Sequence, residues 1–213
     1  MSKIALLLGS LRRPGNGVGI ASWLTPVLRE GFNNFNNVDT ARSTPKPRAD
    51  VLFVDPTKPP LPLGPIVDGS HVPADIRDPT KHPNPSVREF ATFASACSGF
   101  VVLSPEYNGS YPGELKNTLD HLYWEWRNKP VMIITYGGGG GTRCAALLKT
   151  LLGGSLKMRV VDKAVAIKLP RTHSGGTEKV PTDGSAPEWL EAYKPDILEA
   201  VEEMKRLIIN KPE

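Results

Sequence analysis

The stretch SPEYNGSYPGELKNTLDHL, residues 104–122, directly follows the apolar run of residues 99–103. An uninterrupted apolar run of this length is typical of a strand that is buried on both faces of a sheet. Pro105 and Gly109 favour a turn, and Pro112 stands where a helix tolerates proline, at its first position. The stretch therefore predicts a strand that ends in a turn and passes at once into a helix.

The same alternation of short apolar runs and longer helical patterns continues along the chain, as in a parallel sheet covered by helices. We expect strands over residues 4–8, 51–54, 99–103, 131–135 and 159–167. Helices are expected over residues 20–32, 87–96, 112–126, 142–152 and, near the C-terminus, 195–209. This order predicts an α/β fold: a doubly wound, three-layer, five-stranded parallel sheet with strand order 2-1-3-4-5. In such sheets, ligands bind beyond the carboxyl ends of the strands.

The composition is that of an ordinary globular protein. The chain has 213 residues, of which 39% are hydrophobic and 23% charged, and we expect a single domain over residues 1–213. The net charge of +4 comes without a dense Lys/Arg run, which favours a solvated surface over a nucleic-acid interface. No apolar run approaches the ~18 residues of a membrane span. Cys97 and Cys144 lie in no paired motif, so we expect reduced thiols and a cytoplasmic protein.

Two long segments carry no regular pattern. Residues 56–85 are rich in proline and predict a long loop, since proline interrupts hydrogen-bonded structure. Part of this segment, Lys58 to Pro65, is also a candidate docking motif for another protein. Residues 172–189 form a second extended loop with no assigned role. The four histidines, His71, His82, His121 and His173, show no metal-ligand spacing, and we expect surface residues and no metal site.

Loops rich in glycine or turn-forming residues follow the first, third and fourth expected strands. In the first loop, residues 9–19, Ser10 and Arg12 precede the N-terminus of a helix. The two side chains and the helix N-terminus together suit a phosphate group. The loop lacks the GK[ST] ending of a nucleoside-triphosphate site, and an ordinary strand-to-helix turn remains an alternative.

The other two loops suit a planar ligand. Tyr107 offers a flat apolar face, and Asn108 tolerates unusual backbone angles. The alternative is that Tyr107 and Tyr111 only cover the hydrophobic core. Five consecutive glycines, residues 137–141, allow a large flat group to approach the backbone, with a flexible lid as the rival interpretation.

Together, GSLR at residues 9–12, PEYNGSYPGELKNTLD at 105–120 and YGGGGG at 136–141 resemble the NADPH-dependent FMN reductase family of flavodoxin-like proteins. The resemblance spans residues 3–167. It implies FMN as cofactor, NADPH or NADH as co-substrate, a homodimer or dimer of dimers, and a small-molecule electron acceptor such as a quinone, an azo compound, a free flavin or a metal ion.

Residue by residue, the resemblance also implies a cofactor site in three parts. Phosphate-binding positions are Ser10, Arg12, Asn16, Gly17 and Val18. Residues bordering the flavin ring are Pro105, Glu106, Tyr107, Asn108, Gly109 and Ser110, with Tyr136, Gly137 and Gly138 in a second ring-binding loop.

The mechanism implied by the resemblance is a ping-pong reaction in which NADPH gives hydride to flavin N5 and leaves before the acceptor takes the electrons. It requires no catalytic side-chain acid or base, because the flavin carries the chemistry. Two alternatives stay open: a flavodoxin-like electron carrier that does not use a pyridine nucleotide, and a flavin-binding regulatory module.

Overall fold

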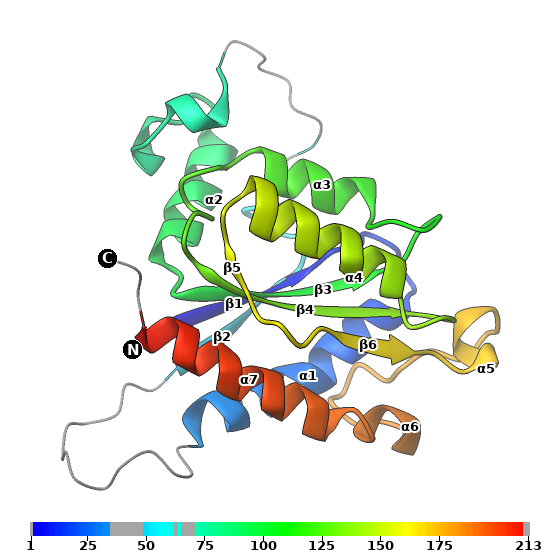
Figure 1. Ribbon diagram of the computed structural model, residues 1–213. Helices are drawn as coiled ribbons and strands as arrows, with labels where there is room; N and C mark the ends of the chain where they lie inside the picture. The colour runs from blue at the N-terminus through cyan, green and yellow to red at the C-terminus, as the bar shows by residue number, and fades with distance from the viewer. Residues whose placement is uncertain (1, 35–48, 62–63, 65–70, 211–213) are drawn as a thin grey trace, which may run out of the picture.

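The computed structural model describes residues 2–34, 49–61, 64 and 71–210. Its centre is a parallel sheet (Figure 1) with the strand order β2-β1-β3-β4-β5, which confirms the predicted order. The strands are β1 (Ser2–Leu8), β2 (Ala49–Val54), β3 (Gly99–Pro105), β4 (Pro130–Gly137), β5 (Arg159–Val160) and β6 (Val165–Lys168). Both β5 and β6 pair with β4.

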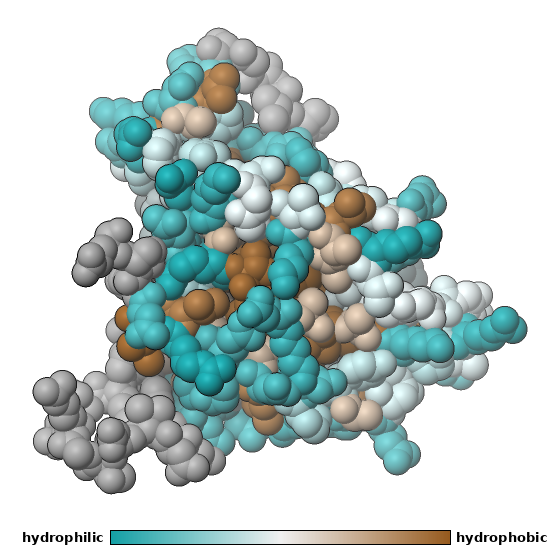
Figure 2. All heavy atoms as spheres, in the orientation of Figure 1, coloured by the Kyte–Doolittle hydropathy of each residue, from teal (hydrophilic) through white to brown (hydrophobic). Residues whose placement is uncertain are grey.

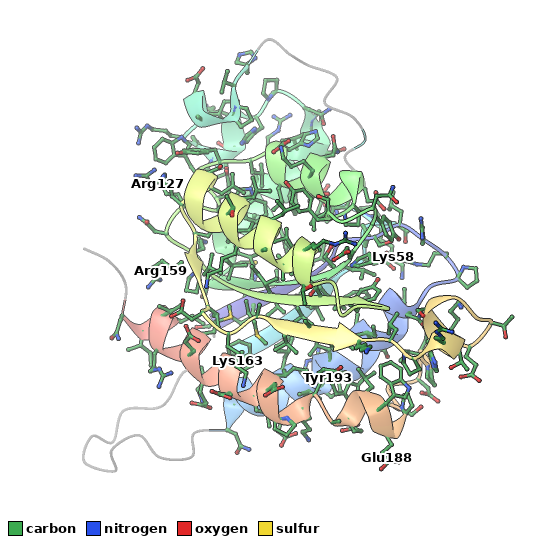
Figure 3. The ribbon with its side chains drawn as sticks, turned by 45° about the vertical axis from the view of Figure 1, so that its right-hand side comes forward. Lys58, Arg127, Arg159, Lys163, Glu188 and Tyr193 are labelled. Atoms are coloured by element: carbon green, nitrogen blue, oxygen red, sulfur yellow. The ribbon has the colours of Figure 1, made fainter. Side chains whose placement is uncertain are left out.

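The fifth expected strand, residues 159–167, is therefore two strands, and the prediction of one continuous strand was wrong. Asp162 and Lys163 interrupt it by turning toward helix α7 (Lys194–Ile209). The Asp162 N–H donates to the Glu203 carboxylate at 2.7 Å, and the Lys163 ammonium pairs with Asp196 at 2.8 Å. Figure 3 shows Lys163 between the edge of the sheet and α7. Polar contacts with α7 thus replace part of the backbone hydrogen bonding between this segment and β4.

Helices cover both faces of the sheet (Figure 1). On one side lie α1 (Asn16–Asn33) and α7, and on the other α2 (Pro85–Ala96), α3 (Gly113–Asp120) and α4 (Thr142–Lys149), which a π-helical turn (Thr150–Ser155) extends. Two short helices, α5 (Arg171–Ser174) and α6 (Glu188–Glu191), follow β6. Alternate residues of β1 enter the two cores, Ile4 and Leu6 on the side of α1 and Ala5 and Leu7 on the side of α2.

The face seen in Figure 2 is mostly polar, with apolar side chains in a band between α4 and α7. No helix in the described ranges is long and apolar enough to cross a membrane.

Helix α3 ends at Asp120, six residues before the expected end at residue 126. The following turns place the Trp126 side chain in the core, where it is fully buried against Phe90 and Phe100 at ring distances of 5.9 and 4.8 Å. Its indole N–H donates to the Leu119 carbonyl at 3.0 Å. Burial of this large side chain outweighs continuation of the helix.

The described part of the proline-rich segment contains only two single 3-10 turns, Pro73–Asp75 and Pro79–Lys81, as expected for a loop. Asn84 then caps α2 by accepting the N–H groups of Ser86 and Val87. The Trp124 indole N–H donates to the Ala74 carbonyl at 2.7 Å and fixes the segment to the connection between α3 and β4. Part of the expected docking motif, residues 62, 63 and 65, lies outside the described residues.

The prediction that the histidines lie at the surface was wrong for His82, His121 and His173, which are buried. Each has a polar partner that makes burial acceptable. His82 lies 3.4 Å from the buried Glu125 carboxylate, and His121 Nδ1 donates to the Asn117 carbonyl at 2.6 Å. Among the described residues, no group of three or more His, Cys, Asp or Glu is arranged to hold a metal ion.

Candidate functional site

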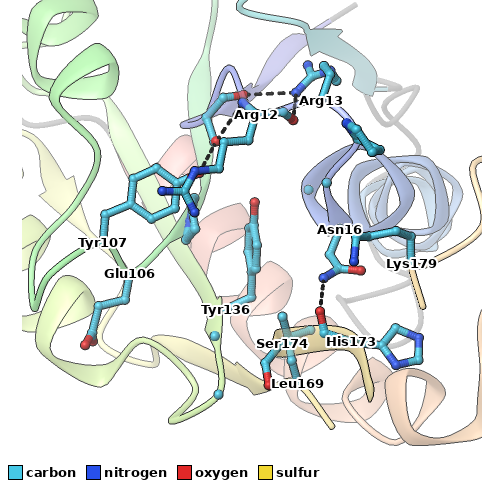
Figure 4. Close-up of a pocket in the computed structure, with 17 residues that line it drawn as sticks. Arg12, Arg13, Asn16, Glu106, Tyr107, Tyr136, Leu169, His173, Ser174 and Lys179 are labelled. Atoms are coloured by element: carbon cyan, nitrogen blue, oxygen red, sulfur yellow. Dashed lines mark hydrogen bonds between the residues drawn. The ribbon is translucent and has the colours of Figure 1, made fainter. Parts of the chain in front are cut away.

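A pocket of about 340 Å³ opens beyond the carboxyl ends of β1, β3 and β4 (Figure 4). This is the position that a doubly wound sheet offers to a ligand. The three loops identified in the sequence meet there. The predicted site residues that line the pocket are Ser10, Arg12, Asn16, Gly17, Pro105, Glu106, Tyr107, Tyr136, Gly137 and Gly138. Val18, Asn108, Gly109 and Ser110 are not among its lining residues.

The loops after β1 and β3 are tied together by Ser10, Arg12 and Tyr107. The hydroxyl groups of Ser10 and Tyr107 lie 2.6 Å apart, and the Arg12 backbone N–H donates to Ser10 Oγ at 3.2 Å. The Arg12 guanidinium lies 4.0 Å from the centre of the Tyr107 ring. This cation–π contact holds the Arg12 charge at the pocket wall, where no carboxylate from the described ranges pairs with it.

The N-terminus of α1 faces the same pocket, through Asn16 and Gly17. Gly15 precedes the helix, no side chain caps it, and its first turn contains no acidic residue. The first N–H groups of a helix have no partner within the helix, and the helix dipole makes this end positive. The start of α1 is therefore suited to an anion.

The Asn16 side chain has a structural role. Its Nδ2 donates to the His173 carbonyl at 2.9 Å, and its Oδ1 accepts the Val180 N–H at 3.1 Å. Both ends of the amide are thus used to join α1 to the segment after β6, which leaves the backbone N–H of Asn16 at the helix start.

Asn108 and Gly109 form the tip of a two-residue turn. Tyr107 and Ser110 exchange backbone hydrogen bonds of 2.8 and 3.0 Å around them. Asn108 has a φ of 51° and Gly109 a φ of 82°, the left-handed angles that such a turn needs at both central positions. The pair of residues shapes the loop that presents Tyr107.

The Glu106 side chain reaches away from the centre of the pocket to the start of α4. Its carboxylate accepts Arg143 Nε at 2.9 Å and Nη2 at 2.6 Å, together with the backbone N–H groups of Arg143 at 3.2 Å and Cys144 at 3.4 Å. Although partial burial acts in the opposite direction, these hydrogen bonds lower the pKa of Glu106. Glu106 therefore caps α4 as an ionised carboxylate.

The glycine run divides into two parts. Gly140 and Gly141 have φ angles of 81° and 78°, and a β-carbon at residue 141 would lie 2.9 Å from Thr135 Cβ. These two glycines are needed for the turn itself. Gly137 and Gly138 line the pocket instead.

The hydroxyl of Tyr136 lies in the pocket lining without a hydrogen-bond partner from the described part of the protein. The Tyr136 side chain is only 6% exposed. Burial raises the pKa of Tyr136, and the neighbouring Tyr107 adds to the effect. The hydroxyl stays protonated and is available to donate to a ligand.

Seven further residues line the pocket. Arg13, Pro14 and Gly15 belong to the expected first loop, where Arg13 was considered as a charged donor, whereas Leu169, His173, Ser174 and Lys179 were missed by the sequence analysis. Arg13 is paired with Asp55 at 2.8 Å. The four missed residues come from the segment after β6, whose sequence carries no motif that indicates the site.

Residues 2–170 match the sequence profile described as NADPH-dependent FMN reductase, and the chain belongs to that family. It is 32% identical over 212 residues to an NAD(P)H-dependent FMN reductase of Nectria sp, covering 98% of each chain. The identity is 31% over 181 residues with an NAD(P)H-dependent FMN reductase of Saccharomyces cerevisiae, covering 85% of this chain and 86% of that one. A quinone reductase of Escherichia coli K12 is 34% identical over 131 residues, covering 59% of this chain and 64% of that protein.

Among solved structures, the flavoenzyme NAD(P)H:(acceptor) oxidoreductase FerB of Paracoccus denitrificans superposes with a TM-score of 0.62 at 19% identity. The match covers 96% of this chain and 99% of that chain and supports the flavodoxin-like fold. By family, the protein is an oxidoreductase whose cofactor is FMN and whose co-substrate is NAD(P)H.

Proposed function

We propose that FMN binds in the pocket beyond β1, β3 and β4, and that the enzyme passes electrons from NAD(P)H to a quinone-like acceptor, with azo compounds, free flavins and metal ions as further candidates. The observation that carries the proposal is the Tyr136 hydroxyl, which has no hydrogen-bond partner among the described residues and lies in the pocket lining beside the uncapped start of α1. A polar group of the pocket lining that the protein leaves without a partner can orient a ligand, so a ligand that accepts its hydrogen bond fits this place.

The residues present suit both parts of FMN, its phosphate and its ring. The positive start of α1, Ser10 and Arg12 suit the phosphate, since backbone N–H groups and a guanidinium both donate to phosphate oxygens. The backbone of the Tyr107 loop and the bare backbone of Gly137 and Gly138 suit a planar ring. Residues 105–110 and 136–138 would therefore border the ring, as the family resemblance implies.

Bound FMN supplies the hydride-accepting and electron-donating chemistry. The protein binds, orients and shields the cofactor. Arg12 and the α1 N–H groups would hold the phosphate, and the Tyr107 loop would position the ring. No side chain of the pocket is required as an acid or base, and we propose a ping-pong order. Initial-rate measurements at several acceptor concentrations test it, because a ping-pong order gives parallel lines in a double-reciprocal plot and intersecting lines exclude it.

The first experiment is the absorption spectrum of the purified protein before and after anaerobic addition of NADPH. A flavin band that bleaches supports the reductase. A band that persists favours the electron carrier, the alternative that uses no pyridine nucleotide. A colourless protein that also fails to take up added FMN would contradict the proposed site.

We also propose that the protein acts as a homodimer or dimer of dimers in the cytoplasm, as the family resemblance implies. Analytical ultracentrifugation of the purified protein tests the assembly, and a monomer at micromolar concentration contradicts it.

A further inference from the structure

The segment after β6 forms a wall of the pocket although it lies beyond the residues that match the family profile. The match ends at residue 170, whereas His173, Ser174 and Lys179 line the pocket. The family resemblance therefore assigns no role to these side chains.

This segment is held firmly against the start of α1. Asn16 bonds the His173 carbonyl on one side and the Val180 N–H on the other. One turn further along α1, a β-carbon on Gly19 would collide with the Val180 carbonyl, so the two backbones are in direct contact. These contacts place Lys179, the residue before Val180, beside the first turn of α1. In Figure 4 the Lys179 side chain runs toward Asn16.

The charges around the pocket are only partly balanced. Arg13 is paired with Asp55, and Glu106 with Arg143. Lys179 Nζ donates only to the carbonyls of Gly176 at 3.0 Å and Glu178 at 2.9 Å, with no carboxylate partner in the part of the chain that the structure describes.

Arg12 likewise contacts the Tyr107 ring and has no carboxylate partner there. Among the described residues, two cations thus remain without a carboxylate partner at the end of the pocket where α1 begins and the Tyr136 hydroxyl lies. A phosphate monoester carries about two negative charges at neutral pH, and this charge would balance the two cations.

We propose that Lys179 is a ligand of the cofactor phosphate, supplied by a segment outside the family core and positioned by Asn16. The inference rests on the proposed FMN site. It makes Lys179 a binding residue that acts opposite Arg12, with the phosphate between the segment after β6 and the loop after β1.

The test compares the affinities of the full chain for FMN and for riboflavin, which lacks the phosphate. Wild type, Lys179→Ala and Lys179→Arg are freed of flavin and titrated while flavin fluorescence is followed. Thr177→Ala, an exposed position in the same segment, is the matched control. Loss of a charge-assisted hydrogen bond at a partly exposed site should raise the FMN dissociation constant of Lys179→Ala roughly fivefold to fiftyfold. Riboflavin affinity should be unchanged, Lys179→Arg should retain most of the FMN affinity, and Thr177→Ala should behave as wild type.

An FMN dissociation constant unchanged in Lys179→Ala would overturn the inference while leaving the FMN site intact. Equal losses for FMN and riboflavin would overturn it too, because they would indicate a disturbed segment rather than a lost phosphate contact. A wild-type protein that binds neither flavin would instead refute the proposed site, and the inference with it.

Discussion

The hydroxyl oxygen of Tyr136 occupies the space in which a β-carbon on Gly17 would lie. Gly17→Ala should therefore displace a buried tyrosine that lines the pocket. Overpacking of this kind costs about 1–3 kcal/mol, offset in part by the better helix propensity of alanine. We expect a lower free energy of unfolding, measured by urea denaturation followed by circular dichroism.

The Tyr136→Phe background separates this collision from a general defect. The phenylalanine lacks the colliding oxygen, and its introduction breaks no hydrogen bond to the described part of the protein. Gly17→Ala should thus cost about 1 kcal/mol less in that background. Equal costs in both backgrounds would shift the cause to Leu8, whose Cδ1 would lie 2.9 Å from the new β-carbon.

Arg12→Ala should weaken FMN binding. Charge-assisted hydrogen bonds to a phosphate contribute about 1.5–3 kcal/mol, so the dissociation constant should rise roughly tenfold to a hundredfold. Isothermal titration of the flavin-free protein measures the change. Arg88→Ala, on the exposed side of α2, provides the control, and an unchanged FMN affinity in Arg12→Ala would show that Arg12 is not a phosphate ligand.

Glu106→Gln should destabilise the protein at neutral pH. The lowered pKa of Glu106 means that its ionised form stabilises the fold above the usual carboxyl range. This contribution is lost as the pH falls through the lowered pKa. The loss of the α4 cap should cost about 1 kcal/mol at pH 7, and the difference between wild type and variant should shrink below about pH 4.

Thermal unfolding of both proteins between pH 3 and pH 7 measures this effect. Glu89→Gln removes a carboxylate from an exposed position on α2 and should leave the pH dependence of wild type intact. A constant difference between wild type and Glu106→Gln over the whole range would contradict the ionised cap.

The sheet was predictable because its strands are continuous apolar runs that end in distinctive loops, such as the one after β3. The break between β5 and β6 was not, since it depends on Lys163 meeting Asp196, 33 residues later in the chain. Local sequence patterns indicate which residues are buried and where the chain turns, whereas this interruption depends on a contact with a distant helix, α7.

The site divides in the same way. Ser10, Tyr107 and Tyr136 follow strands whose ends meet, so their positions could be inferred from the strand order. The wall formed by Lys179 could not, because it depends on Asn16 contacting His173 across 157 residues. The buried His82 has a similar cause, as its partner Glu125 lies 43 residues away.

The two cysteines should be unreactive in the folded protein. Cys97 and Cys144 are buried and free, and burial raises the pKa of each thiol to about 11. Only the thiolate is nucleophilic, so at pH 8 roughly one thiol in a thousand is in the reactive form, and it is also shielded. Reaction with an aromatic disulfide reagent should release almost no chromophore from the native protein and two equivalents after unfolding in guanidinium. Rapid release from the native protein would mean that one of the thiols is accessible, and Cys97→Ser and Cys144→Ser would identify which.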